Sequence, residues 1–151
     1  MTSYIYLSSD AELATGSVGD KGVTIFQTTI YATENLMEFF FFEPNYDTDE
    51  QHFFSFSKHF SSKKYQVASI DQNLPEQAEN KINKRQKKAL TELLSYVRNH
   101  FNHTNATYIE LLFCLNSYEN EPLKHKKIIK YKELSLNDLF YEELKFLTLT
   151  K

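Results

Sequence analysis

The chain has 151 residues, a formal net charge of −3 and one cysteine. Its length fits a single domain over 1–151, and one cysteine excludes an internal disulfide. The sequence shows neither a basic, apolar leader nor a run of about 20 apolar residues, so we expect a cytoplasmic protein without a membrane segment.

Strands are predicted through the first half of the chain, wherever β-branched and aromatic residues alternate or cluster. The four consecutive phenylalanines favour a strand buried on both faces, with a short helix capped by Thr33 as the alternative. The acidic stretch that follows them is predicted to be a loop. The predicted strands cover 3–9, 23–33, 36–43, 52–59 and 65–70.

One long amphipathic helix is predicted over about 75–102. Pro75 suits its first turn, and Asn73 is the expected N-cap. Because apolar residues thin out before Ala89, we expect the second half of the helix to pack and the first half to be solvated. The residues that recur at steps of three and four, and so share one face, are Leu90, Leu93, Leu94 and Val97.

Three more strands are predicted after the helix, at 107–115, 126–136 and 144–150, the last with helix as the alternative. The second of them carries several lysines, which is typical of strands at sheet edges. A helical turn is expected within 137–143. Short connections between strands favour an α+β fold, in which a mainly antiparallel sheet of about six to eight strands packs against the one long helix.

A loop that holds all three glycines is the best candidate for a small-ligand site. Glycines at every third position leave backbone N–H groups free to face an anion such as phosphate. Phosphate-binding loops normally open a helix, whereas a strand is predicted to follow here, so a plain connection is the simpler interpretation. The residues that would bind the ligand are Gly16, Ser17, Gly19, Asp20 and Lys21.

Catalytic residues, cofactors and metals are not predicted. The acidic loop around Asp49 lacks the spacing of a calcium-binding loop, so we expect it to be solvated. His100 and His103 have no evident third ligand for zinc, and we expect both to be exposed. Cys114 lies in an apolar strand, where a thiol is usually inert. These patterns weigh against an enzyme.

Charge is unevenly distributed along the chain. Residues 1–50 hold nine acids and one lysine, whereas residues 51–132 hold fourteen lysines and arginines against seven acids. The two regions either attract each other within one fold or form a polar binding face. For a binding face, the predicted partner contacts are Lys81, Lys84, Arg85 and Lys88.

The leading hypothesis is therefore a small, non-catalytic protein that binds a protein partner or itself, of the partner-inhibiting or immunity type. A homodimer joined through strands or phenylalanine side chains is one form of it. The alternative is a small enzyme or anion-binding protein that uses the loop at 16–22. Nucleic-acid binding through 81–88 is the weakest reading, because the sequence pI is about 6.0 and no nucleic-acid-binding motif is present.

Overall fold

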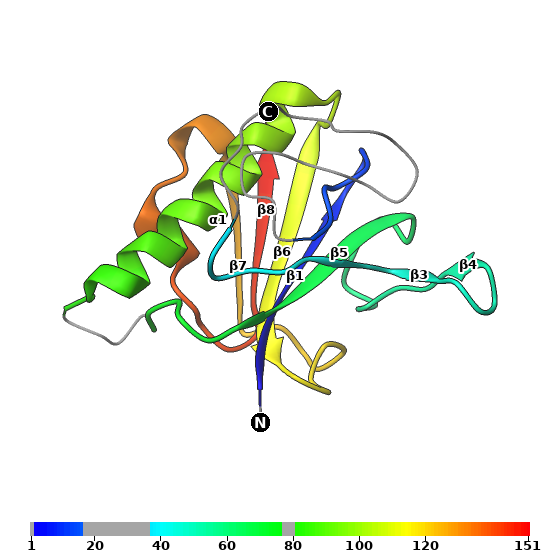
Figure 1. Ribbon diagram of the computed structural model, residues 1–151, viewed down its shortest axis with the longest axis horizontal. Helices are drawn as coiled ribbons and strands as arrows, with labels where there is room; N and C mark the ends of the chain where they lie inside the picture. The colour runs from blue at the N-terminus through cyan, green and yellow to red at the C-terminus, as the bar shows by residue number, and fades with distance from the viewer. Residues whose placement is uncertain (1, 17–36, 77–80) are drawn as a thin grey trace.

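The computed structural model describes residues 2–16, 37–76 and 81–151, and it shows an α+β fold (Figure 1). One α-helix, α1 (Lys84–His103), packs on a sheet, and two short 3-10 helices, η1 (Tyr131–Glu133) and η2 (Leu136–Leu139), follow later in the chain. The strands are β1 (Ser3–Ser9), β2 (Glu43–Pro44), β3 (Tyr46–Asp47), β4 (His52–Phe53), β5 (Tyr65–Asp71), β6 (Tyr108–Leu115), β7 (His125–Lys130) and β8 (Lys145–Thr150).

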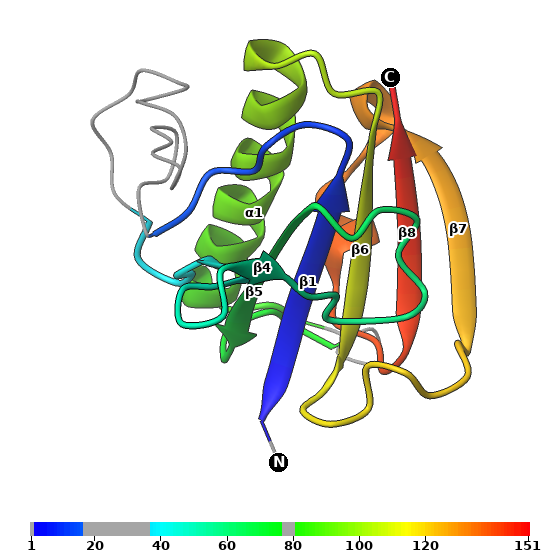
Figure 2. The ribbon, with the colours of Figure 1, turned by 90° about the vertical axis from the view of Figure 1, so that its right-hand side faces the viewer.

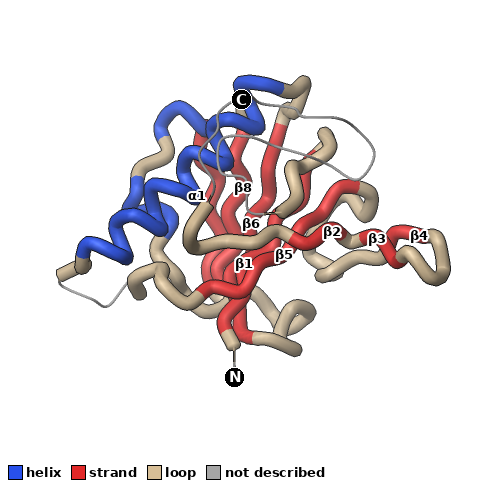
Figure 3. Tube along the Cα trace, in the orientation of Figure 1, coloured by secondary structure: helices blue, strands red, loops and turns tan. Residues whose placement is uncertain are grey.

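The main sheet has six strands in the order β2-β5-β1-β6-β8-β7, and β3 pairs with β4 in a separate two-stranded hairpin (Figure 3). Every neighbouring pair in the main sheet is antiparallel except β7 and β8, which are parallel. Parallel neighbours require a crossover connection. The segment 131–144, which contains η1 and η2, makes that crossover, and η1 and η2 both contact α1.

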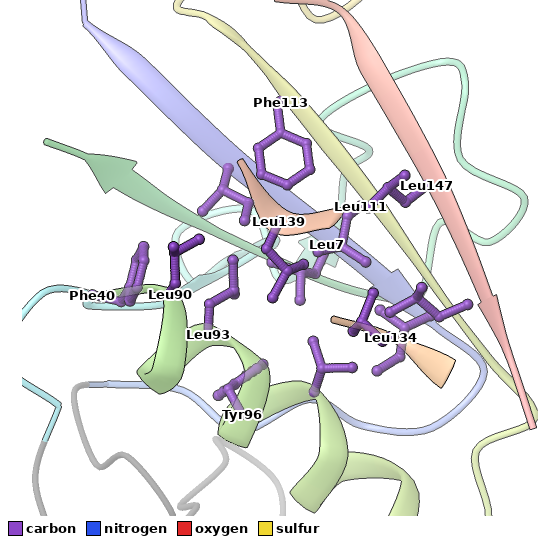
Figure 4. Packing of buried hydrophobic residues seen from close by; sticks show 14 of the residues in the cluster. Leu7, Phe40, Leu90, Leu93, Tyr96, Leu111, Phe113, Leu134, Leu139 and Leu147 are labelled. Atoms are coloured by element: carbon purple, nitrogen blue, oxygen red, sulfur yellow. The ribbon is translucent and has the colours of Figure 1, made fainter. Parts of the chain in front are cut away.

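Both faces of the sheet are buried at its central strands, which explains why these strands are apolar almost throughout. On one face, Leu7, Leu111 and Leu147 pack with Leu90 and Leu93 of α1 (Figure 4). The other face is covered by the segment that connects β4 to β5, seen crossing the strands in Figure 2. The residues that meet there include Tyr6, Phe56, Phe60, Leu112 and Phe146.

Helix α1 begins at Lys84 rather than at Pro75, and Asn83 rather than Asn73 is its N-cap. The Asn83 side chain accepts a hydrogen bond from the Gln86 N–H, and the Gln86 side chain accepts one from the Asn83 N–H, so the two form a capping box. Pro75 instead accepts a hydrogen bond at its carbonyl from the Tyr141 N–H, at 2.8 Å. The prediction that packing starts at Ala89 is confirmed.

The predicted strand at 36–43 is wrong for its described residues, because among 37–43 only Glu43 joins the main sheet, as part of the two-residue β2. The backbone N–H groups of Glu38 and Phe39 donate to the Glu92 carboxylate on α1, so these two residues are bound to the helix and not to a neighbouring strand. Its phenylalanines accordingly differ in environment: Phe40 and Phe42 are buried, whereas Phe41 is 59% exposed.

The strand predicted at 52–59 is also wrong beyond Phe53. Two buried polar side chains organise the chain there instead. The Gln66 side-chain oxygen accepts a hydrogen bond from the Phe56 N–H at 2.7 Å, and the Asn45 amide donates to the Phe54 carbonyl at 2.6 Å. The predicted strand at 23–33 lies outside the described residues.

In the last third of the chain, the predicted strand at 126–136 ends early, at Lys130. Tyr131 turns inward and stacks on Phe101 of α1, with ring centroids 4.5 Å apart, which carries the chain off the sheet and into η1. The helical turn expected within 137–143 is the shorter η2, Leu136–Leu139. The edge position of the lysine-bearing strand is confirmed, since β7 is the outermost of the strands that the structure describes on that side of the sheet.

Candidate partner-binding site

Strand β7 pairs with β8 on one side and has no strand on its other side among the described residues. The Leu144 carbonyl accepts hydrogen bonds from the Lys124 N–H just before the strand, at 2.9 Å, and from the His125 N–H, at 3.3 Å. Because His125 is the first residue paired in the ladder, opposite Lys145, we infer that the odd-numbered positions of β7 face β8. Backbone groups alternate in direction along a strand. The N–H and C=O groups of Lys126, Ile128 and Lys130 therefore point away from the sheet. We call the residues His125–Lys130 the β7 edge.

The side chains of the β7 edge are basic around one exposed apolar residue. Ile128 is 75% exposed, and its neighbours Lys126, Lys127 and Lys130 are all exposed. Lys124 and Lys132 extend the basic run beyond both ends of the strand, and no acid interrupts the stretch from 124 to 132. This combination places positive charge and an apolar side chain beside backbone groups that no described strand pairs with.

Two hollows lie alongside the β7 edge, between the strand and the crossover segment. The first, of about 450 Å³, is lined by His125, Lys127, Asp138, Glu142 and Lys145 among others. The second, of about 500 Å³, also contains Lys127 and Asp138, and adds residues from the far end of β7. An ion pair joins the Lys127 Nζ to the Asp138 Oδ1 at 3.3 Å, so the two hollows meet at this pair.

Lys145 lines the first hollow and is almost completely buried. Its Nζ donates to the carbonyl oxygens of Asp138, at 2.9 Å, and Phe140, and lies 4.5 Å from the centre of the Phe113 ring. Burial lowers the pKa of Lys145 to about 8. Because the amine is held by two carbonyls and a ring face, its role is to fasten η2 onto the sheet and so to shape the hollow.

The carboxylates of the first hollow are each paired with a β7 side chain. Glu142 Oε1 lies 2.8 Å from His125 Nε2. Burial alone would raise the pKa of Asp138, but hydrogen bonds from Ser135 and Lys127 lower it below its usual value. Asp138 thus neutralises part of the positive charge of the strand through Lys127, while its outer side remains basic.

Ser9 and His100 form a buried pair near the C-terminal end of α1. The expectation that His100 is exposed is therefore wrong. Ser9 Oγ lies 2.8 Å from His100 Nε2 and donates its only proton to the Tyr108 carbonyl at 3.0 Å. His100 Nε2 must therefore carry the proton in this pair. Both side chains are fully enclosed, so a substrate cannot reach them and the pair is structural. His103 is exposed, as expected.

The glycine loop can be placed at one residue only. Gly16 has a left-handed φ of 85° and exchanges both backbone hydrogen bonds with Phe42, at 2.8 and 3.0 Å. Its N–H is therefore already used within the protein. The other residues predicted to bind a ligand lie outside the described residues: Ser17, Gly19, Asp20 and Lys21.

The basic residues predicted on the helix are divided between solvent and the fold. Lys81 and Lys84 are exposed. Arg85 lies over the Phe39 ring, 4.9 Å from its centre, and Lys88 forms an ion pair with Glu38. Arg85 and Lys88 thus already contact residues from the acidic first third of the chain. Because these contacts lie within one molecule, the two residues are less available to bind a partner.

The acidic turn and Cys114, which were considered as a metal site and a nucleophile, are both held in contacts within the protein. At the acidic turn, Asp47 Oδ1 accepts hydrogen bonds from the Asp49 and Glu50 N–H groups. Within the described part of the chain, no group of three or more His, Cys, Asp or Glu side chains is placed to hold a metal ion. Cys114 is buried, and burial together with the nearby Glu119 raises its thiol pKa to about 12.

Sequence reasoning identified β7 as a lysine-bearing edge but missed the hollows beside it. They depend on the crossover that makes β7 and β8 parallel, which leaves no local sequence signal. Comparison with models of known protein families finds no match, and comparisons with curated proteins and with solved structures find none either. Of the helices in the described ranges, none has the length and apolar character needed to cross a membrane.

Proposed function

We propose that this protein is a non-catalytic binding module that takes up an extended, acidic segment of a partner protein along the β7 edge. The observation that carries the proposal is the outer side of β7, with which no strand of the described residues pairs and where backbone groups, lysines and the exposed Ile128 occur together. A partner-inhibiting or immunity-type role in the cytoplasm would use such a surface.

Hydrogen bonds to the backbone would supply the basic affinity. A strand added to β7 would pair with the N–H and C=O groups of Lys126, Ile128 and Lys130, extending the sheet by one strand. Its side chains would alternate between the two faces of the sheet. Those on the face of α1 would point toward the hollows, and those on the other face would lie beside Ile128.

Charge would supply the specificity. Lysines on an edge strand disfavour addition of a neutral or basic strand, because their charges would be crowded or desolvated without a partner. An acidic strand converts that penalty into attraction. In the first hollow, an incoming carboxylate would compete with Asp138 for Lys127, whose present pair is long at 3.3 Å. Attraction of this kind also speeds association at low salt.

A direct test uses a peptide of alternating glutamate and valine and measures its affinity by fluorescence anisotropy. The double variant K126E/K130E should weaken binding at least about tenfold, because two attractive contacts become repulsive. The matched control K84E/K87E changes the same net charge on exposed residues of α1, and it should bind as the unchanged protein does.

Equal binding by K126E/K130E and the unchanged protein would contradict the proposal. A single-stranded oligonucleotide provides the second comparison. If it binds more tightly than the peptide and loses affinity in K84E/K87E, the basic helix is a nucleic-acid site and the protein-binding proposal is wrong.

A further inference from the structure

We propose that a pocket on the β2 side of the sheet binds a small organic cation with an apolar body. The pocket has a volume of about 450 Å³, which is within the range of small-ligand sites in proteins. It lies at the end of the strand order opposite β7, between β5 and residues 37–43, which lead into β2. We call residues 37–43 the phenylalanine segment and the space beside them the edge pocket.

Ser69 opens the edge pocket by interrupting the pairing of the phenylalanine segment with β5. Strand β2 is only two residues long and pairs with Val67 and Ala68. Continued pairing would next place Phe41 opposite Ile70. Instead, the Phe41 N–H donates to Ser69 Oγ at 3.1 Å, and Ser69 Oγ donates to the Ile70 carbonyl at 3.0 Å. A side chain thus lies where two backbones would meet, and it keeps the two segments apart.

The other end of the phenylalanine segment is fastened to α1. The Glu92 carboxylate accepts hydrogen bonds from the Glu38 N–H at 3.0 Å and from the Phe39 N–H at 3.1 Å. The segment is therefore held from both sides, by α1 and by β5. A pocket whose walls are already fixed binds a ligand with little loss of conformational entropy in the protein.

The lining of the edge pocket combines apolar surface with negative charge. Phe41 is 59% exposed and Ile70 is 44% exposed, so an apolar ligand body would cover side chains that otherwise face water. The phenylalanine segment also contributes two acids to the lining, Glu38 and Glu43. None of the described residues that line the pocket is basic, so an anionic ligand would be repelled.

Contacts within the protein show that the phenylalanine segment attracts cations. Arg85 lies 4.9 Å from the centre of the Phe39 ring, and Lys88 lies 5.9 Å from it. Lys88 also forms an ion pair with the Glu38 carboxylate. A ring face beside a carboxylate is thus an arrangement that holds positive charge in this fold.

Phe41 and Glu43 offer the same two groups to a ligand in the edge pocket. Glu43 is exposed, and its carboxylate forms no ion pair with a described residue. The positive charge of the ligand would lie at this carboxylate, and its apolar body would lie against Phe41 and Ile70. This site is separate from the β7 edge and adds a small-molecule ligand to a protein-binding module.

Backbone amide chemical shifts, measured by NMR during titration with phenethylamine, test the proposal. This probe is an ammonium group on an aromatic body, and the largest shifts should occur at Phe41, Ser69 and Ile70. Hydrocinnamate, an anion of similar size, should cause no shift at these amides. The uncharged phenethyl alcohol should bind at least about fivefold more weakly than the amine, because it lacks the attraction to the carboxylate.

The variant Glu43→Gln keeps the shape of the side chain and removes its charge. Phenethylamine should bind to it about fivefold more weakly than to the unchanged protein. Because Glu43 is exposed, the substitution should leave the fold intact. Glu121→Gln is the matched control, since Glu121 is also exposed and lies outside the pocket, and it should leave the affinity unchanged.

Equal affinity for the amine and the alcohol, or for Glu43→Gln and the unchanged protein, would overturn the proposal. So would a failure of both phenethylamine and the bulkier benzyltrimethylammonium to shift the amides of Phe41, Ser69 and Ile70. A peptide of alternating lysine and valine provides the last comparison. If it shifts the same amides at concentrations about tenfold lower, the pocket binds a basic segment of a partner protein and the small-cation proposal is wrong.

Discussion

Replacing Leu93 by alanine is expected to lower the free energy of unfolding by about 3 kcal/mol. Leu93 is fully buried at the centre of the face that α1 turns toward the sheet (Figure 4). Truncation removes apolar contacts and leaves a cavity between two rigid layers, which can collapse only in part. Urea unfolding followed by circular dichroism measures the loss.

The adjacent Leu94 is the matched control for this change. It is only partly buried and packs at the rim of the same cluster. Leu94→Ala removes the same atoms from the same helix, and we expect a loss of about 1 kcal/mol. Similar losses for the two variants would show that α1 does not pack with Leu93 facing inward, and the two-layer arrangement would then be wrong.

Acidification is expected to destabilise the protein by about 3 kcal/mol between pH 7 and pH 4 through His100 alone. Burial lowers the pKa of His100 to about 4 from its ordinary value of 6.5, while the charge of the nearby Asp10 opposes that shift. The unfolded chain therefore binds a proton on His100 across this range and the folded protein does not. Stability is fully present above pH 6.5 and is lost as the pH falls toward 4.

Urea unfolding at pH 7, 6, 5 and 4 measures this loss, with His100→Gln as the comparison. Glutamine does not titrate, and its amide can donate to Ser9 Oγ as the imidazole does. Other groups also titrate in this range, including the buried Asp71, whose pKa is raised by burial. The informative quantity is therefore the difference between the two pH profiles. Parallel profiles would show that His100 is not buried in its neutral form.

The α+β class and several strands could be predicted because they depend on local patterns. The first strand was expected at 3–9 and is found at Ser3–Ser9, since its apolar run is buried on both faces of the sheet. The secondary structure at Phe39 could not be predicted from neighbouring residues. Its backbone N–H donates to the Glu92 carboxylate, which is distant in the sequence. The helix start was misplaced because Pro75 fits a first turn as well as it fits an extended connection.

For the candidate site, the sequence indicated an edge strand with lysines but not what surrounds it. The hollows form only because Tyr131 stacks on Phe101 and Lys145 is held by the carbonyls of η2 and the turn after it, which together bring the crossover beside β7. These contacts link segments far apart in the chain. The same holds for Arg85 and Lys88, whose intramolecular contacts were not evident from a basic stretch alone.

The most direct test of strand addition is backbone amide hydrogen exchange, measured by NMR with and without the glutamate–valine peptide. The amides of Lys126, Ile128 and Lys130 should exchange more slowly when the peptide is bound, whereas those of Lys127 and Ile129, already directed at β8, should change little. A peptide methylated on its backbone nitrogens but unchanged in charge should give no protection. If the unmethylated peptide binds and Ile128 still exchanges as fast as in the free protein, the acidic segment does not extend the sheet and the account is contradicted.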